Sequence, residues 1–305
     1  MVQRPTTPDR RLIRLATTVS VAMAVILTLA KAAVWRSSGS VALMASMADS
    51  ALDLAAATGT FFAVRYAAAP PDAEHRFGHG KAEAFASLMQ AGLVFASAAL
   101  VGEEAIQRML RPEPVTHAGL GIAVMVVSIA LTALLIAVQT RALSRSDSIA
   151  VEADRTHYLL DLASNIVALA AIAATAIVHL PLIDPLAGLV IVALLLRGAV
   201  SVFRQAADQL MDRELPDEAR DAIVRLIKAD PAILDVHQLR TRAAGPITYI
   251  QMHADLDPEL SLEAAHKVVV AAERRVLSAY PAADILIHAD PRGRAEPHGG
   301  AFAER

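Results

Sequence analysis

Two aspartates stand four residues apart in an apolar stretch of this chain. Asp49 and Asp53 lie within SMADSALDLAAATGTFF (46–62), and four-residue spacing puts both side chains on the same face of a helix. A carboxylate inside a membrane costs about 2.5–3.5 kcal/mol on insertion scales. Two of them on one face therefore predict a partner that offsets this cost.

A second pair with the same spacing lies further along the chain. His157 and Asp161 occur in EADRTHYLLDLASN, again in a helical and largely apolar segment. Two helices that face each other with D-x-x-x-D and H-x-x-x-D supply three carboxylates and one imidazole, a tetrahedral set that suits Zn²⁺. The alternative is scattered polar residues that face neighbouring helices or water, but two such pairs favour a metal site. We expect Asp154, one turn before His157, to be solvated near the cytoplasmic end of its helix.

The loop PPDAEHRFGHGK (70–81) holds a third group of metal-binding residue types. His75 and His79 are spaced H-x-x-x-H, and Asp72 lies three residues upstream. Spacing supports a second metal site and a pair of ordinary exposed loop histidines about equally. We expect this stretch to be solvent-exposed, so that its metal binds weakly and exchanges fast. GHGK lacks the glycine of a phosphate loop, and Ala82 replaces its Ser or Thr, so no nucleotide site is expected.

Histidines and aspartates also recur where the C-terminal part alternates like strands. His288 and Asp290 are two residues apart and so share one face of a strand, and His253 and Asp255 do likewise. Neighbouring segments bring further histidines to this region. One histidine here would be an ordinary surface residue, but four of them (His237, His253, His266 and His288) with an aspartate in so small a domain favour a metal site.

The chain is apolar enough to place most of these residues in a membrane. It has 305 residues, 55% of them hydrophobic, and a mean hydropathy of +0.45. A bilayer of about 30 Å needs about 20 helical residues per span. Six segments meet this length, and they lie near 12–35, 40–66, 82–107, 115–140, 149–179 and 183–204.

Charge and composition exclude several classes of function. The formal net charge of −3 gives no indication of a nucleic-acid partner. The absence of cysteine excludes disulfides and thiolate metal sites. Basic residues gather before the first span and in the loops on that same side, which predicts that both termini are cytoplasmic. The basic residues ahead of the first span or in its first turn are Arg4, Arg10, Arg11 and Arg14.

From about residue 210 the pattern changes to that of a small α+β domain. Helical spacing over 216–229 and 261–280 alternates with strand patterns over 233–242, 247–257 and 283–290. The order αββαβ predicts a ferredoxin-like domain with helices covering one face of the sheet. The predicted domains are a cytoplasmic N-terminal segment 1–11, a six-helix transmembrane domain 12–209, a cytoplasmic metal-binding domain 210–291, and a disordered tail 292–305.

Taken in order, six motifs make the chain resemble the cation diffusion facilitator family, in its bacterial zinc and ferrous-iron efflux branch (YiiP/FieF-like). They are MADSALD, HRFGHGKAE, HYLLD, DRELPDE, HQLRTR-x-x-GP and ILIHADP, between about residues 10 and 291. The resemblance implies a homodimer with six spans and a cytoplasmic ferredoxin-like domain in each protomer. It implies that Asp49, Asp53, His157 and Asp161 form the transport site, that Asp72, His75 and His79 form the loop site, and that Lys81 and Asp212 form an ion pair at the dimer. It also implies a binuclear site of His237, His253, His266, His288 and Asp290, with Asp290 bridging.

The predicted function is secondary antiport in the cell inner membrane. Crowded carboxylates in a vacant site hold protons, and metal binding needs the deprotonated ligands, so metal and protons replace one another. We therefore expect export of divalent cations, most of all Zn²⁺ and also Fe²⁺ or Cd²⁺, by alternating access with protons as the coupling ion. A metal sensor is disfavoured because it has no use for ligands inside the membrane. A metallohydrolase is disfavoured because H-E-x-x-H is absent and the quartet leaves no open zinc position.

Overall fold

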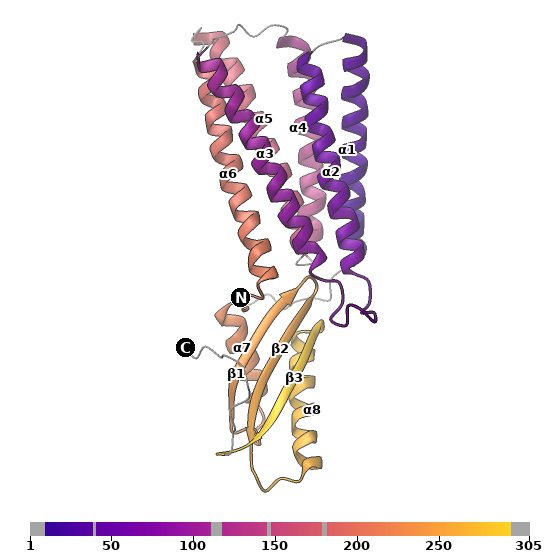
Figure 1. Ribbon diagram of the computed structural model, residues 1–305, viewed down its shortest axis with the longest axis vertical. Coiled ribbons are helices and arrows are strands. Elements are labelled where there is room, and N and C mark those ends of the chain that lie inside the picture. Colours follow the sequence, from indigo (N-terminus) through magenta and orange to yellow (C-terminus); the bar gives the residue numbers. More distant parts are fainter. Residues whose placement is uncertain (1–9, 39–40, 111–117, 145–147, 179–181, 294–305) are drawn as a thin grey trace. The chain divides into compact units, whose positions relative to one another are not determined.

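The computed structural model describes the chain except for residues 1–9, 39–40, 111–117, 145–147, 179–181 and 294–305. The chain divides into two compact units, a helical one that ends at Ala207 and a C-terminal one that begins at Asp208. The two units are described separately below, and Figure 1 labels their elements.

Six long helices lie side by side in the helical unit (Figure 1). They are α1 (Arg10–Ser38), α2 (Val41–Ala67), α3 (Ala82–Leu110), α4 (Ala118–Leu143), α5 (Ile149–Val178) and α6 (Ile183–Leu210). At 1.5 Å per residue each is about 40 Å long, enough to cross a bilayer. Among the described residues, α1, α3 and α6 contain stretches that are apolar enough to be membrane spans by length and composition, and α4 contains a shorter one. Helices α2 and α5 instead carry the ionisable residues that the sequence singled out.

Small side chains form the contacts between these helices. Ala57 of α2, Ala91 of α3 and Ala153 of α5 are all buried. At Gly188 of α6 a Cβ atom would lie 2.9 Å from the Cβ of Ala105 in α3, so the glycine permits a close approach of the two helices. Small residues have this use in membrane bundles, where lipid provides no hydrophobic force between helices.

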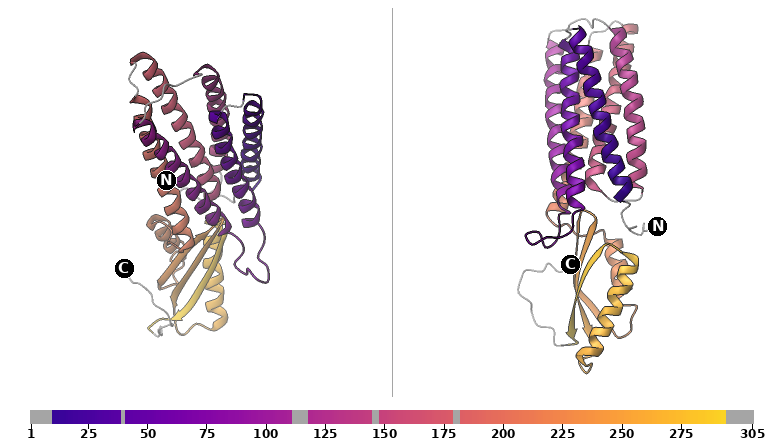
Figure 2. Two further views of the ribbon diagram at one scale, coloured as in Figure 1. Left: turned by 45° about the horizontal axis from the view of Figure 1, so that its top comes forward. Right: turned by 90° about the vertical axis from the view of Figure 1, so that its right-hand side faces the viewer.

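The C-terminal unit has the predicted order αββαβ, which confirms the fold class. Its elements are α7 (Asp217–Ile227), β1 (Asp235–Ala244), β2 (Ile247–Leu256), α8 (Leu262–Ala279) and β3 (Ala283–Pro291). The sheet order is β1-β2-β3, with β1 antiparallel and β3 parallel to the central strand. Both helices cover one face of the sheet (Figure 2). The other face carries the histidines discussed below.

Strict alternation along β2 separates the two faces of the sheet. Ile250, Met252 and Ala254 point into the core with Ile223 of α7 and Val276 of α8, and all five are at most 2% exposed. The residues between them in β2 face the opposite side, because side chains alternate along a strand. Core packing of the helices therefore fixes which residues are left on the open face.

Local signals explain how the elements begin and end. Gly245 has φ +57° in the two-residue connection from Ala244 to Ile247, a conformation that glycine adopts without strain. Ser261 caps α8 by accepting a hydrogen bond from the Ala264 backbone N–H. A bulge lies in β1 between His237 and Arg240, where the pairing with β2 shifts by one residue.

Several observed boundaries differ from the sequence expectations. Helix α6 continues to Leu210, beyond the span predicted near 183–204, and β1 begins at Asp235 rather than 233. The later start of β1 has a local cause, because Asp230 holds the preceding turn. Its side chain accepts from the Ala232 N–H, and its carbonyl accepts from the Ile233 N–H.

Candidate metal sites

One group of potential metal ligands lies inside the helical unit. Nε2 of His157 on α5 is 3.0 Å from Oδ1 of Asp53 on α2 and 3.4 Å from Oδ2 of Asp161 on α5. One ligand atom from each residue lies within 4.8 Å of the others. The side chain of His157 is 9% exposed, and those of Asp53 and Asp161 are 20% and 31% exposed. Two carboxylates and an imidazole therefore converge from two helices in a largely buried place.

Asp49, the fourth predicted ligand, has its backbone in α2, one turn before Asp53. Its side chain lies outside the described residues. Its participation in the group stays a prediction that rests on the four-residue spacing.

Asp154 differs from its sequence expectation. It was expected to be solvated, but it is 1% exposed. Its carboxylate accepts hydrogen bonds from Ser20 Oγ at 2.8 Å, Gln90 Nε2 at 3.0 Å and Gln139 Nε2 at 2.7 Å. These donors belong to α1, α3 and α4. Four helices meet at Asp154, and this convergence excludes the water that its position in the sequence suggested.

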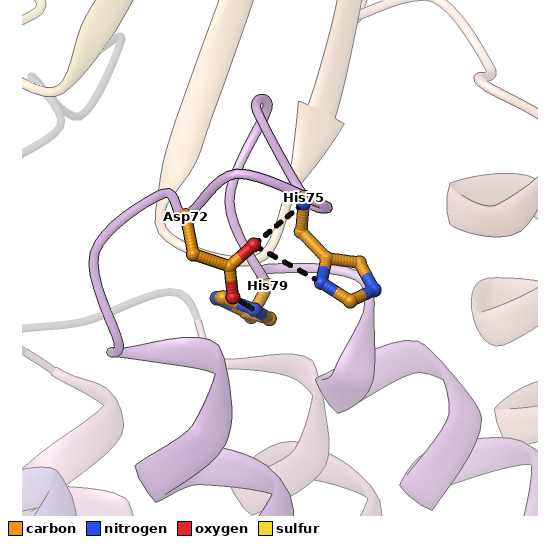
Figure 3. A group of neighbouring side chains, drawn as sticks. All are labelled: Asp72, His75 and His79. Carbon is orange, nitrogen blue, oxygen red and sulfur yellow. Dashed lines mark hydrogen bonds and ion pairs between the residues drawn. The ribbon is translucent and has the colours of Figure 1, made fainter.

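The second group lies in the loop between α2 and α3 (Figure 3). Oδ2 of Asp72 is 3.1 Å from Nε2 of His79, and Oδ1 of Asp72 is 3.4 Å from Nδ1 of His75. The side chains of Asp72 and His75 are about half exposed, as expected, but that of His79 is only 3% exposed. The ring of His79 packs against Tyr66 of α2, with 4.4 Å between ring centroids. The expectation of exposure is therefore wrong for His79, because its ring packs against the last turn of α2.

The backbone of this loop prepares Asp72 to bind a cation. Its Oδ1 accepts from the backbone N–H groups of His75 at 2.6 Å and Glu74 at 2.9 Å. The hydrogen bond from the His75 backbone, together with the nearby imidazoles, lowers the pKa of the Asp72 carboxyl from its ordinary value. Asp72 is thus an ionised ligand at neutral pH, held in place by its own turn.

The third group lies on the open face of the sheet in the C-terminal unit. His237, His253 and His288 are partners across β1, β2 and β3 in the strand register. Asp290 is 4% exposed and lies among them. Its Oδ2 is 2.9 Å from Nδ1 of His253 and 3.4 Å from Nε2 of His237, and its Oδ1 is 3.3 Å from Nε2 of His288. The two oxygens of Asp290 therefore face different histidines.

Two residues of the predicted sets are placed differently. His266 is exposed on α8, and the group of three ligands described for this unit, His237, His253 and Asp290, does not include it. Asp212 lies in the C-terminal unit, where its Oδ2 accepts from Arg242 Nη1 at 3.0 Å. Lys81 lies in the helical unit, directly before α3. The Lys81–Asp212 pair stays a prediction.

Some contacts of these sites could not be found from sequence spacing. Tyr66 reaches His79 across the end of α2, and Asp255 Oδ1 lies 3.7 Å from His237 Nδ1 across two strands. The Ser20, Gln90 and Gln139 contacts to Asp154 join helices far apart in the sequence. Only the His253 and Asp255 alternation gave a signal in advance, because it placed Asp255 on the histidine face.

Comparison with known families agrees with this division of the chain. Residues 17–211 match the model of the cation efflux transmembrane domain, and residues 215–292 match that of the cation efflux protein cytoplasmic domain. The boundary between the two matches falls close to the boundary between the two units.

Curated relatives and solved structures are similar to the chain over different extents. The cation-efflux pump FieF of Shewanella oneidensis is 39% identical over 92% of this chain and 94% of its own length. The cation-efflux pump FieF of Serratia proteamaculans is 38% identical over 92% of this chain and 93% of its own length. The metal-bound C-terminal domain of the CzcD transporter from Thermotoga maritima is 24% identical, with a TM-score of 0.25, over 27% of this chain and 100% of that one. The chain therefore belongs to the cation efflux family, as a multi-pass membrane transporter with a cytoplasmic C-terminal domain rather than an enzyme.

Proposed function

We propose that this chain exports divalent metal cations from the cytoplasm by exchanging them for protons. The observation that carries the proposal is the group of Asp53, His157 and Asp161, whose ligand atoms lie within 4.8 Å inside the helical unit. With Asp49 one turn before Asp53, the site has three carboxylates and one imidazole. This donor set suits Zn²⁺ best and also accepts Fe²⁺ and Cd²⁺.

Proton coupling follows from the charge of the same ligands. Three carboxylates in a low-dielectric site repel one another, so the vacant site gains from protons. A metal ion binds only the deprotonated ligands and therefore displaces those protons. A site that opens alternately to the two sides exchanges one for the other, and no nucleotide is needed.

The transporter works as a homodimer in the inner membrane, with both termini in the cytoplasm. The cluster of basic residues just before and within the first turns of α1, namely Arg4, Arg10, Arg11 and Arg14, supports this orientation. The match of residues 215–292 to the cytoplasmic domain of cation efflux proteins supports association through that domain. Zinc held by Asp290 and its neighbouring histidines serves there as a structural or regulatory ion.

Proteoliposomes that contain the purified protein test this function. Zn²⁺ added on one side should be taken up with opposite movement of protons, followed by a zinc dye and a pH dye. Asp53→Ala and Asp161→Ala should each lower uptake by about 100-fold or more, because each removes a ligand from a site with none to spare.

A matched control comes from α3. Glu104→Gln removes a carboxylate that pairs with Arg108 at an exposed position, and it should leave uptake unchanged. Wild-type flux in either aspartate variant would exclude this ligand set. A metal-dependent change in the conformation of the C-terminal unit, without any flux of Zn²⁺, would favour a metal sensor.

A further inference from the structure

Asp154 is a buried carboxylate that the proposed transport site does not use. It is 1% exposed and lies on α5, three residues before His157. In the part of the chain that the structure describes, it forms no ion pair, and the three side chains that donate to it are all neutral. Neutral donors do not cancel a charge, and an ionisable group inside a membrane bundle indicates function.

The amides that hold Asp154 carry unused oxygen atoms. Gln90 and Gln139 are at most 1% exposed, and each donates its Nε2 to the carboxylate. Among the described residues, the Oε1 atoms of both amides are buried and have no hydrogen-bond partner. A buried amide oxygen without a partner is expensive, and each of these lies on the same planar group as the nitrogen that faces Asp154. The cluster therefore has two spare acceptors directly beside a buried anion.

Rotation of these amides converts the cluster into a set of oxygen ligands. A 180° turn exchanges Oε1 and Nε2, so that the amide oxygens lie where the nitrogens are now, at 3.0 and 2.7 Å from the carboxylate oxygens. Neighbouring ligand oxygens around a small divalent cation are about 2.9 Å apart, since metal–oxygen distances of about 2.0–2.1 Å meet at right angles. Ser20 Oγ already contacts a carboxylate oxygen of Asp154, and it lies 3.4 Å from the hydroxyl oxygen of Tyr158.

We propose that Asp154, Gln90, Gln139 and Ser20 form a second, weak cation-binding site in the helical unit, which we call the entry site. All its ligands are oxygen atoms. A divalent cation binds there before it reaches Asp53, His157 and Asp161. This inference rests on the proposed function for the direction of passage. Asp154 lies one turn nearer the start of α5, the end that the basic residues assign to the cytoplasm. One carboxylate and neutral oxygens bind a cation loosely, so the ion leaves easily for the stronger site. If Asp154 only bound a proton, that proton would need a single hydrogen-bond acceptor. The cluster instead has two buried amide oxygens without a partner among the described residues, which fits a cation better.

Saturation curves for Zn²⁺ uptake in proteoliposomes test the entry site with two variants, one that removes a negative charge from it and one that adds a negative charge. Asp154→Asn keeps the shape and removes the charge, so the half-saturating Zn²⁺ concentration should rise by about tenfold. Its maximal rate should stay within about twofold, because the transport ligands are intact. Gln139→Glu adds a carboxylate, so the half-saturating concentration and the maximal rate should both fall, because the cation is held longer.

The matched control removes a buried polar group elsewhere in the bundle. Thr60 of α2 is 1% exposed, and its Oγ1 has no hydrogen-bond partner within the described part of the chain, so Thr60→Val should change neither parameter. A purely structural role for Asp154 predicts a lower maximal rate and no opposite shift in half-saturation between the two variants. That result would overturn the inference.

A binding measurement separates this inference from the transport function itself. Full-length protein that carries Asp53→Ala and Asp161→Ala is titrated with millimolar Mn²⁺, a hard divalent probe, and bound Mn²⁺ is counted by electron paramagnetic resonance. Adding Asp154→Asn should remove one bound Mn²⁺ per chain, and adding Thr60→Val should remove none. Equal Mn²⁺ binding with and without Asp154 would contradict the entry site, and so would the finding that Asp154 takes up a proton and binds no Mn²⁺. This readout stands even if the wild-type protein transports no Zn²⁺.

Discussion

At the scale of single residues, His157 is the nitrogen donor among carboxylates in the helical unit. Its Nε2 contacts both Asp53 and Asp161, so one atom joins the two helices. Nitrogen is a softer ligand than a carboxylate oxygen and favours Zn²⁺ over harder cations. The choice of metal should therefore depend on this one side chain.

His157→Asp tests this dependence. Replacing nitrogen by oxygen should lower the preference for Zn²⁺ over Mn²⁺ by about tenfold, and the pH optimum of uptake should move because the only imidazole of the group is gone. Competition between Zn²⁺ and Mn²⁺ in proteoliposomes, repeated at several pH values, measures both effects. An unchanged metal preference together with an unchanged pH profile would show that His157 is not the proton-coupled ligand.

The sequence predicted ligands that repeat along a helix and failed for a residue that depends on distant partners. Four-residue spacing paired His157 with Asp161, and the structure places them together. Asp154 lies on the same helix, yet the sequence expectation of a solvated aspartate was wrong. Its burial comes from Gln90 and Gln139, which belong to other helices, and spacing within one helix carries no information about them.

At the scale of elements, the loop after α2 is more ordered around its ligands than its composition indicated. Asp72 accepts two backbone hydrogen bonds, and Tyr66 covers His79. H-x-x-x-H spacing left the choice between a metal site and exposed histidines open. The packing of His79 against α2 depends on how the chain folds back, which no local pattern in this stretch encodes.

Loss of the loop ligands should weaken transport only partly. In the double variant His75→Ala with His79→Ala, metal binding in the loop should fall by about 100-fold or more. Uptake should fall by less than tenfold, about 1.4 kcal/mol, since the ligands within the helices remain. Proteoliposome uptake and loop occupancy of Zn²⁺ are measured side by side.

Glu74→Gln is the matched loop control. Glu74 is exposed and contacts Asp72 through its backbone N–H, which this change keeps, so neither quantity should alter. Loss of transport as complete as in Asp53→Ala would show that the loop is part of the translocation path.

The strands illustrate what alternation can and cannot predict. Two-residue spacing put His253 and Asp255 on one face, and the structure places both on the open face of the sheet. The bulge after His237 was not predicted, because an extra residue in a strand leaves no mark in so short a pattern. His266 was expected near these histidines, but α8 presents it to solvent.

At the scale of the whole molecule, the two units carry separate groups of ligands and have separate cores. The core of the C-terminal unit joins α7, α8 and all three strands, so this unit has the packing that an independent domain needs. The helical unit holds ionisable residues in a bundle of small side chains. A metal ion in the C-terminal unit is therefore expected to control association or stability, and one in the helical unit to be moved.

Asp290→Ala and His253→Ala in full-length protein test this division of labour. Asp290 contacts three histidines, so its loss should weaken Zn²⁺ binding in the C-terminal unit by about 100-fold or more. Association that depends on Zn²⁺ should weaken with it, as seen by light scattering with and without a chelator. Proteoliposome uptake should fall only partly, because neither residue belongs to the helical unit.

Glu263→Gln, which alters an exposed pair with Lys267 on α8, should match the wild type in both assays. If a fragment of residues 210–291 takes up no Zn²⁺ by calorimetry, this unit holds no metal site. If Asp290→Ala stops uptake as fully as Asp53→Ala, the ion in the C-terminal unit is required for transport itself.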